Sequence, residues 1–416
     1  MTLRFFQKVA YSRTHRWLHL AVMAVVLSAC GPLSRFDAVP VAVEPRATIP
    51  NMEKIRFWGD SGDTAAVATE GKASYDRELA QWVADGHTGP LPPAQFLAIS
   101  GGGENGAFGA GVLVGWTAAG TRPEFKMVTG ISTGALTAPF AFLGPAYDDK
   151  LRAVYTTISA KDIMESRGLY GILFQDAMAD NTPLRRTVAK YFDQAMLDAI
   201  GAEYKKGRLL LIGTTNLDAM RPMIWNIGAM AVSGRPDRLK LVHDILVASA
   251  AIPGAFPPVM IDVEADGKTY QEMHVDGGAA AQVFVYPPSL DVGASDQEAG
   301  RMRERHLYVI RNARLDPEWA QVERGTMSIA GRAITSLIQT QGVGDLYRIY
   351  LTAQRDGFDF NLAYIPRSFD TPLKEPFDTA YMQALFQVGY ELGVNGYPWE
   401  KVPPGFAGTE GATASN

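Results

Sequence analysis

Ser132 stands between two glycines in the segment Gly130-Ile131-Ser132-Thr133-Gly134, after an apolar stretch over 125–129. A serine on a tight turn between a strand and a helix exposes its hydroxyl and can act as a nucleophile, and the flanking glycines let neighbouring backbone pass close to it. The chain has 41 glycines, so this spacing can also arise by chance. Ser132 could instead merely cap a helix that begins near Ala135. The motifs around Ser132 are needed to choose between a nucleophile and a helix cap.

A serine nucleophile needs a base, and the sequence offers two kinds. The histidines after residue 29 are His87, His243, His274 and His306. A Ser-His-Asp triad in the chain order of α/β-hydrolases requires a late histidine, which would be His306, although an ordinary strand start over 306–310 explains that residue equally well. The stronger candidate is Asp276, which an apolar strand delivers to the glycine turn Gly277-Gly278. A carboxylate with an ordinary pKa of about 3.9 deprotonates serine only if it is partly desolvated and held at hydrogen-bond distance. The alternative is a common Asp-Gly turn.

A glycine loop precedes the serine by one strand and one helix. A buried strand is predicted over 95–100, and the loop that follows contains Gly101, Gly102, Gly103 and Gly106. Backbone N–H groups of such a loop, at the start of a helix, can bind an oxyanion. The glycine spacing also fits a dinucleotide fingerprint, but that fingerprint needs an acid after the second strand, and Glu124 comes before it. An oxyanion hole beside Ser132 is therefore the preferred interpretation.

Further apolar segments alternate with helical patterns along the chain. Strands are predicted over 208–217 and 222–227, a helix over 238–251, and a proline-containing scaffold turn over 248–259 in which Ser249 is expected only to pack. After residue 290 we expect a strand from His306 and helices over 333–354 and 379–392. Alternation of strands and helices predicts an α/β fold.

Four blocks occur in an order that resembles the patatin-like phospholipases: the glycine loop 101–106, the serine turn 130–134, the segment 248–259 and Asp276-Gly277-Gly278. The resemblance covers about residues 95–290. It implies a three-layer α/β/α sandwich with a mainly parallel central sheet, a nucleophile at Ser132, a base at Asp276, an oxyanion hole from the loop glycines, and no metal or cofactor. One position departs from the family pattern, because Asn105 stands where the loop usually has arginine or lysine, and this weakens the case for a phospholipid substrate.

The expected activity is hydrolysis of carboxylic esters in phospholipids or related acyl lipids, through an acyl-enzyme on Ser132. An acyltransferase or a thioesterase could use the same Ser–Asp dyad, and a lipid-binding envelope lipoprotein could keep the fold without turnover. The 39 basic residues do not outnumber the 44 acidic ones. A nucleic-acid partner is therefore not expected, because such partners are held by phosphate neutralisation.

The first 29 residues carry four basic and no acidic side chains, and their apolar run, 18–29, is too short to span a bilayer. They are typical of a secretory signal peptide. The segment Leu27-Ser28-Ala29-Cys30 resembles a bacterial lipobox, and Cys30 is the only cysteine of the chain; a short signal anchor is the alternative. Cleavage before Cys30 would change the net charge from −5 to −9. Gly31, in place of an aspartate, favours a lipid anchor in the outer membrane, facing the periplasm.

The predicted organisation of the 416 residues has five parts. A lipoprotein signal peptide covers 1–29 and a proline-rich tether with an N-terminal extension covers 30–94, in which a helix is plausible over 75–83. The catalytic domain covers 95–290, a C-terminal extension packed on it covers 291–402, and a disordered tail covers 403–416. The chain shows no internal repeat.

Overall fold

The centre of the molecule is a nine-stranded sheet in the order β1-β7-β6-β3-β2-β10-β11, with β9 and β8 added beyond β6. This computed structural model describes the chain except residues 1–34, 53–54, 169–175, 299, 301–302 and 407–416. Five adjacent strands are parallel: β6 (Leu209–Asn216), β3 (Met127–Ile131), β2 (Ala94–Ile99), β10 (Arg305–Arg311) and β11 (Asp359–Tyr364). The carboxyl ends of these strands therefore share one edge of the sheet.

Four antiparallel strands complete the sheet. On one side they are β7 (Arg221–Asn226), paired with β6, and β1 (Arg56–Trp58), paired with β7. The hairpin of β8 (Val259–Ala265) and β9 (Lys268–Asp276) joins β6 only through Thr214–Asn216, so most of it extends beyond the carboxyl end of β6. A separate two-stranded ribbon consists of β4 (Glu165–Ser166) and β5 (Ala179–Asp180).

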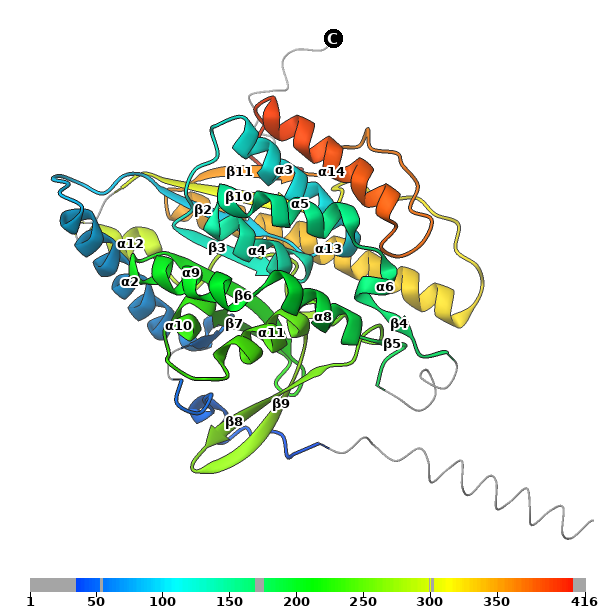
Figure 1. Cartoon of the computed structure of the whole chain (residues 1–416), viewed down its shortest axis with the longest axis horizontal. Coiled ribbons are helices and arrows are strands. Elements are labelled where there is room, and N and C mark those ends of the chain that lie inside the picture. The colour runs from blue at the N-terminus through cyan, green and yellow to red at the C-terminus, as the bar shows by residue number, and fades with distance from the viewer. Residues whose placement is uncertain (1–34, 53–54, 169–175, 299, 301–302, 407–416) are drawn as a thin grey trace, which may run out of the picture.

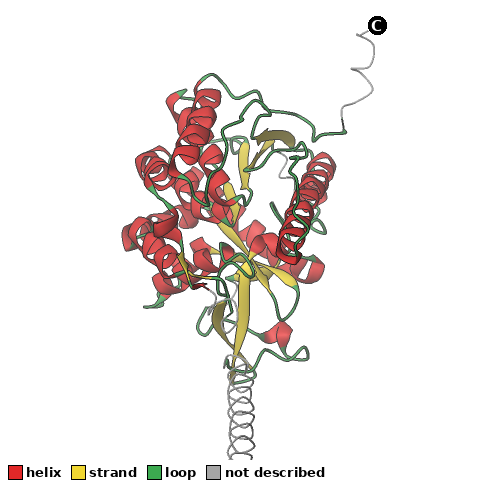
Figure 2. Ribbon diagram, turned by 90° about the vertical axis from the view of Figure 1, so that its right-hand side faces the viewer, coloured by secondary structure: helices red, strands yellow, loops and turns green. Residues whose placement is uncertain are grey.

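Helices cover both faces of the sheet, which gives the three layers expected from the sequence (Figures 1 and 2). The larger layer comprises α3 (Gly106–Ala118), α4 (Thr133–Leu143), α5 (Asp148–Thr157), α6 (Ala160–Ile163), α8 (Thr182–Tyr191), α9 (Gln194–Lys205), α10 (Ile227–Ala231), α11 (Arg238–Ser249) and α14 (Thr379–Val394). The opposite layer comprises α2 (Thr64–Ala84), α12 (Val292–Glu298) and α13 (Thr326–Arg355). Short 3₁₀ turns lie at Glu44–Arg46, Ser61–Asp63, Gly103–Asn105, Pro145–Tyr147 and Gly277–Ala279.

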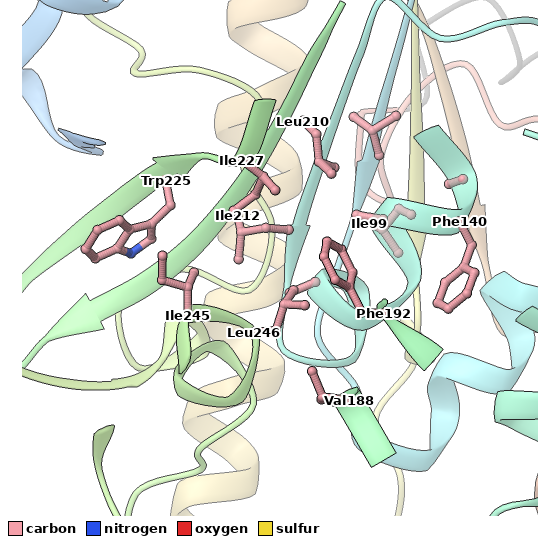
Figure 3. Packing of buried hydrophobic residues seen from close by; sticks show 14 of the residues in the cluster. Ile99, Phe140, Val188, Phe192, Leu210, Ile212, Trp225, Ile227, Ile245 and Leu246 are labelled. Carbon is pink, nitrogen blue, oxygen red and sulfur yellow. The ribbon is translucent and has the colours of Figure 1, made fainter. Parts of the chain in front are cut away.

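The main hydrophobic core lies between the sheet and the larger layer. Ile212 of β6 points toward Ile245 and Leu246 of α11 in Figure 3, and all three side chains are buried. Burial of each such aliphatic side chain stabilises the fold by about 1.5–3 kcal/mol. The strands of a sheet that is covered on both faces are nearly continuous runs of apolar residues, and these runs made the strands recognisable in the sequence.

Residues 30–94 were predicted to form a proline-rich tether with an N-terminal extension, and the tether interpretation is wrong for the described proline-rich part. Residues 35–52 and 55–58 lie on the body, where β1 pairs with β7, and Arg56 forms a buried ion pair with Glu272 of β9. The prolines of this segment alternate with apolar side chains such as Ile49 and Met52, which are buried in the main core. The free energy gained by burying these side chains outweighs the preference of a proline-rich segment for an extended, solvent-exposed conformation. The helix predicted over 75–83 is longer and covers Thr64–Ala84.

The region after residue 290 contributes strands to the sheet itself. β10 lies between β2 and β11 and is connected to β11 through α13. The start of the predicted tail is also ordered, since the ring of Phe406 contacts Tyr347 and Tyr350 of α13. Residues 1–29, Cys30 and 407–416, for which a signal peptide, lipidation and disorder were predicted, lie outside the described residues. Across the described helices, none combines the length and apolarity needed to cross a membrane.

Candidate active site

Ser132 occupies the turn between β3, which ends at Ile131, and α4, which begins at Thr133. Its φ is 56°, a left-handed conformation that a non-glycine residue adopts at a cost of about 1–3 kcal/mol. A Cβ at Gly130 would collide with the carbonyl of Gly134, and a Cβ at Gly134 would collide with the carbonyl of Ile99. Both glycines are therefore required by the close approach of backbone around the serine.

Asp276 is the last residue of β9 and pairs with Thr214 of β6, the strand next to β3. Hydrogen bonding from the Ser132 hydroxyl lowers the pKa of its carboxyl group, which places the two side chains next to each other. A second bond to the same carboxylate comes from the Gly278 amide, 2.7 Å from Oδ1. Ser132 and Asp276 are 7% and 5% exposed, respectively. The structure thus brings together the predicted nucleophile and the predicted base, which are 144 positions apart in the sequence.

Burial makes Asp276 a stronger base than an ordinary aspartate. Loss of solvent raises the pKa of its carboxyl to about 6, and the hydrogen bonds from Ser132 and Gly278 oppose this rise only in part. A base is most effective when its pKa is close to the working pH. This carboxylate is ionised at neutral pH and still has an increased affinity for the serine proton.

The glycine loop presents two backbone amides. The Gly101 amide is already bonded to the carbonyl of Gln282 at 3.1 Å, and the Gly106 amide is bonded within the loop. The amides of Gly102 and Gly103 donate no hydrogen bond within the described part of the chain. Gly102 has a φ of 154°, and a Cβ there would collide with the carbonyl of Asn312. Of the four glycines predicted for an oxyanion hole, Gly102 and Gly103 are the ones whose amides can serve it, and Gly101 and Gly106 shape the loop.

Ser249, expected only to pack, contacts the nucleophile. Its hydroxyl accepts a hydrogen bond from the Ser132 amide at 3.0 Å and donates one to the carbonyl of Gly213 at 2.6 Å. The next turn of the same block reaches the base, because the Asp276 amide donates to the carbonyl of Ala251 at 2.9 Å. The segment 248–259 therefore connects the nucleophile turn with the strand of the base. No local sequence signal distinguishes Ser249 from a packing serine.

Two other supporting residues were not found from the sequence. Asn312, directly after β10, donates its side-chain amide to the carbonyl of Ser100 at 3.0 Å and accepts from the Gly109 amide at 3.1 Å. Gln282 donates to the carbonyl of Gly278 at 2.8 Å, in addition to its contact with Gly101. These amides hold the glycine loop and the turn after Asp276 in place.

No described histidine takes part in the dyad. His306 is the second residue of β10, where it pairs with Gln95 and Asp359 at the amino edge of the sheet, opposite the edge that carries Ser132. His274 is fully buried, and its ring nitrogens lie 3.0 Å from Glu272 Oε2 and Thr214 Oγ1. His243 contacts the carbonyl of Phe192, and His87 stacks on Trp82. Within the described residues, no group of three or more histidine, cysteine, aspartate or glutamate side chains could hold a metal ion.

The loop position that departs from the family pattern has a local partner. Asn105 accepts a hydrogen bond from the Tyr381 hydroxyl at 2.6 Å. The neighbouring Glu104 is largely withdrawn from solvent, and this burial raises the pKa of its carboxyl. The loop therefore carries an acid and an amide where a cation would assist binding of a phosphate.

An apolar cavity of about 200 Å³ lies on the α13 side of the dyad. Its wall includes Ile131 and Gly277, which are adjacent in sequence to Ser132 and Asp276, and small side chains such as Ala281 and Ala353. Its volume and apolar lining suit part of a hydrocarbon chain.

Comparisons with known proteins gave a family match and similar solved structures. Residues 97–287 match the model of the family described as patatin-like phospholipase. Among solved structures, VipD from Legionella pneumophila is similar over 74% of this chain and 67% of that chain, with 12% sequence identity and a TM-score of 0.37. No match was found among curated proteins. The resemblance predicted from the motifs is confirmed for residues 97–287, and the mixed α/β fold with a mainly parallel sheet is confirmed as well.

Proposed function

We propose that the chain is a serine lipid acyl hydrolase that cleaves carboxylic ester bonds of phospholipids or related acyl lipids. The observation that carries this proposal is the placement of Ser132, on its strained turn, beside a buried Asp276 whose pKa is raised to about 6. The family match over residues 97–287 supports the same class of substrate.

In the first half-reaction, Ser132 Oγ attacks the ester carbonyl while Asp276 accepts the serine proton. The amides of Gly102 and Gly103 donate hydrogen bonds to the oxyanion of the tetrahedral intermediate. Asp276 then gives the proton to the leaving alkoxide, so the alcohol departs and the acyl group stays on Ser132. In the second half, Asp276 accepts a proton from water, the hydroxide attacks the acyl-enzyme, and the proton returns to Ser132 as the carboxylic acid is released.

The decisive experiment measures hydrolysis of a short p-nitrophenyl ester. Ser132→Ala should abolish turnover, and Asp276→Asn should reduce it nearly as far, by about 10⁴-fold, because both remove a group that acts in the transition state. Free fatty acid as the product from an acyl lipid supports a hydrolase, whereas transfer to an added alcohol in preference to water would indicate an acyltransferase. Full activity of Ser132→Ala would refute the dyad.

We further propose that Cys30 carries a lipid anchor and that the protein works at the bacterial cell envelope, at the periplasmic side of the outer membrane. Two or more acyl chains would make that attachment stable, whereas a single chain would be marginal. Radiolabelled palmitate should be incorporated into the wild-type chain and not into Cys30→Ser. Membrane fractionation then distinguishes the inner from the outer membrane.

A further inference from the structure

Helix α13 is much longer than the strands that it connects. It has 30 residues and therefore extends about 45 Å, whereas β10 and β11 have seven and six residues and extend about 20–23 Å. About half of the helix must project beyond the sheet. The first buried residue of α13 is Gly342, and the described side chains over 328–341 are exposed or half-buried.

The projecting half lies at the catalytic edge of the sheet. The helix follows the carboxyl end of β10 and runs back toward the amino end of β11, so its amino-terminal half extends past the edge that carries Ser132 and Asp276. Where the helix meets the body, Gln341 accepts a hydrogen bond from Gln282 at 3.0 Å, and Gln282 in turn holds Gly278. Figure 1 shows the free end of α13 at the right of the molecule.

One side of this half-helix is apolar and uncovered. Ile329, Ile334, Leu337 and Ile338 are 55%, 55%, 69% and 40% exposed. The polar side is occupied by the linker that follows β10, because Arg332 donates to the carbonyl of Glu318 and Gln339 donates to the carbonyl of Arg314. Trp319 of the same linker is 88% exposed. Monomeric soluble proteins rarely gather so many large apolar side chains on one exposed element.

We propose that this surface, defined by Trp319, Ile329, Ile334, Leu337 and Ile338, docks on an electrically neutral lipid surface and presents acyl lipids to Ser132. The inference rests on the proposed function for the identity of the substrate. Exposed aliphatic side chains on a helix and an exposed tryptophan beside it can be buried at the boundary between lipid headgroups and acyl chains. Arg332 is the only charged residue over 327–341, so hydrophobic burial, and not attraction to anionic headgroups, would drive the contact.

The start of the described chain favours a lipid surface over a second copy of the chain. Arg35 is bound to Asp218 by two hydrogen bonds of 2.8 Å and contacts Gln271 of β9, on the part of the hairpin that extends from this same edge. Cys30, the proposed lipid anchor, is five residues earlier and can lie at most about 18 Å from Arg35. The anchor would thus hold the catalytic edge, together with α13, next to the membrane.

Fluorescence of the full-length protein tests the docking directly. Neutral phosphatidylcholine vesicles that carry bromine on their acyl chains should quench tryptophan emission, and Trp319→Phe should remove most of this quenching. Because the contact is hydrophobic, about 0.5 M NaCl should leave it unchanged. Absence of quenching that depends on Trp319 would overturn the proposal. A dimer that is lost in Leu337→Asp and that forms without any quenching would also overturn it, because a second copy of the chain would then cover the surface.

Kinetics provide the matched control on the same helix. Leu337→Asp should lower the ratio of the rate on phosphatidylcholine vesicles to the rate on a soluble ester by about tenfold or more, because a buried leucine contact is lost. Leu351→Asp changes a residue that is 56% exposed but lies in the half of α13 beside the sheet, and it should leave the ratio unchanged. Equal effects of the two variants would contradict docking through the projecting half. If the wild-type protein hydrolyses neither substrate, the proposed function fails, while quenching still tests docking.

Discussion

The hydroxyl of Ser249 accepts a hydrogen bond from the Ser132 amide and donates one to the carbonyl of Gly213, so a single buried side chain ties the nucleophile turn to β6. Ser132 adopts a left-handed conformation there, and such strain persists only where surrounding contacts hold it. Ser249 is therefore a positioning residue for the nucleophile. The same contact occupies the Ser132 amide, which leaves oxyanion binding to the glycine loop.

Ser249→Ala should lower kcat on a p-nitrophenyl ester by about 10–100-fold with little change in KM, because the nucleophile loses its alignment while substrate binding remains. Ser249→Thr keeps the hydroxyl and should recover most of the activity. An alanine variant within twofold of the wild-type kcat would show that Gly130 and Gly134 alone hold the turn.

The pKa of Asp276 determines how activity responds to pH. Burial raises it to about 6, and only the ionised form can accept the serine proton, so kcat/KM should rise with pH through a midpoint near 6 and level off about one pH unit higher. A profile of kcat/KM from pH 4 to 9 measures this midpoint. A midpoint near 3.8, the ordinary value for aspartate, would mean that the carboxylate is solvated in the working enzyme.

The same raised pKa predicts a gain in stability when the charge is removed. The folded chain holds the Asp276 proton up to about pH 6 and the unfolded chain only up to about 3.8, so the stability contributed by the protonated group is complete below 3.8 and is lost as pH rises to 6. Asp276→Asn should therefore raise Tm by about 2–5 °C at pH 8 and leave it nearly unchanged at pH 4. A lower Tm of this variant at pH 8 would contradict a desolvated carboxylate.

His306→Ala should retain ester hydrolysis within about twofold of the wild type, because His306 lies at the amino edge of the sheet and contacts Asp359. A triad enzyme with His306 as the base would instead lose activity by several orders of magnitude. Paired rate measurements on His306→Ala and Asp276→Asn separate the two mechanisms.

Glu104 and Asn105 of the glycine loop should influence which lipid headgroup the enzyme prefers. Asn105→Arg places a cation beside Glu104 and near the oxyanion loop, and it should increase the rate on phosphatidylglycerol relative to that on a neutral acylglycerol by about threefold to tenfold. Asn105→Gln keeps the charge and serves as the control for the lost contact with Tyr381. Identical rate ratios for the two variants would show that the headgroup does not approach this loop.

Much of the fold could be predicted because its signals are local. The strand before Gly101 and the strand before the Ser132 turn are apolar and run into glycine-containing turns, and parallel strands bring such ends to one edge. Asp276 reaches the same edge at the end of β9, which is antiparallel to β6. The resemblance to a family then connected them into one site. The helix predicted over 333–354 covers only part of α13, which begins at Thr326. The amino-terminal half of α13 carries exposed apolar side chains that do not pack on the body.

The remaining features depend on contacts between distant segments. Ser249 is 117 positions from Ser132, and Asn312 is 212 positions from Ser100, so neither role leaves a pattern near the residue itself. The proline density before residue 58 suggested a spacer, but Ile49 and Met52 are buried against the body. Local composition cannot show that a complementary apolar surface exists elsewhere in the fold.

The claim that Ser132 is an activated nucleophile can be tested by one measurement, the mass of tryptic peptides after treatment of the purified protein with a fluorophosphonate. The probe should modify Ser132 stoichiometrically in the wild-type protein at pH 8, and Asp276→Asn should remain almost unmodified over the same time. Absence of modification at Ser132, or equally fast modification in Asp276→Asn, would contradict a serine activated by that carboxylate.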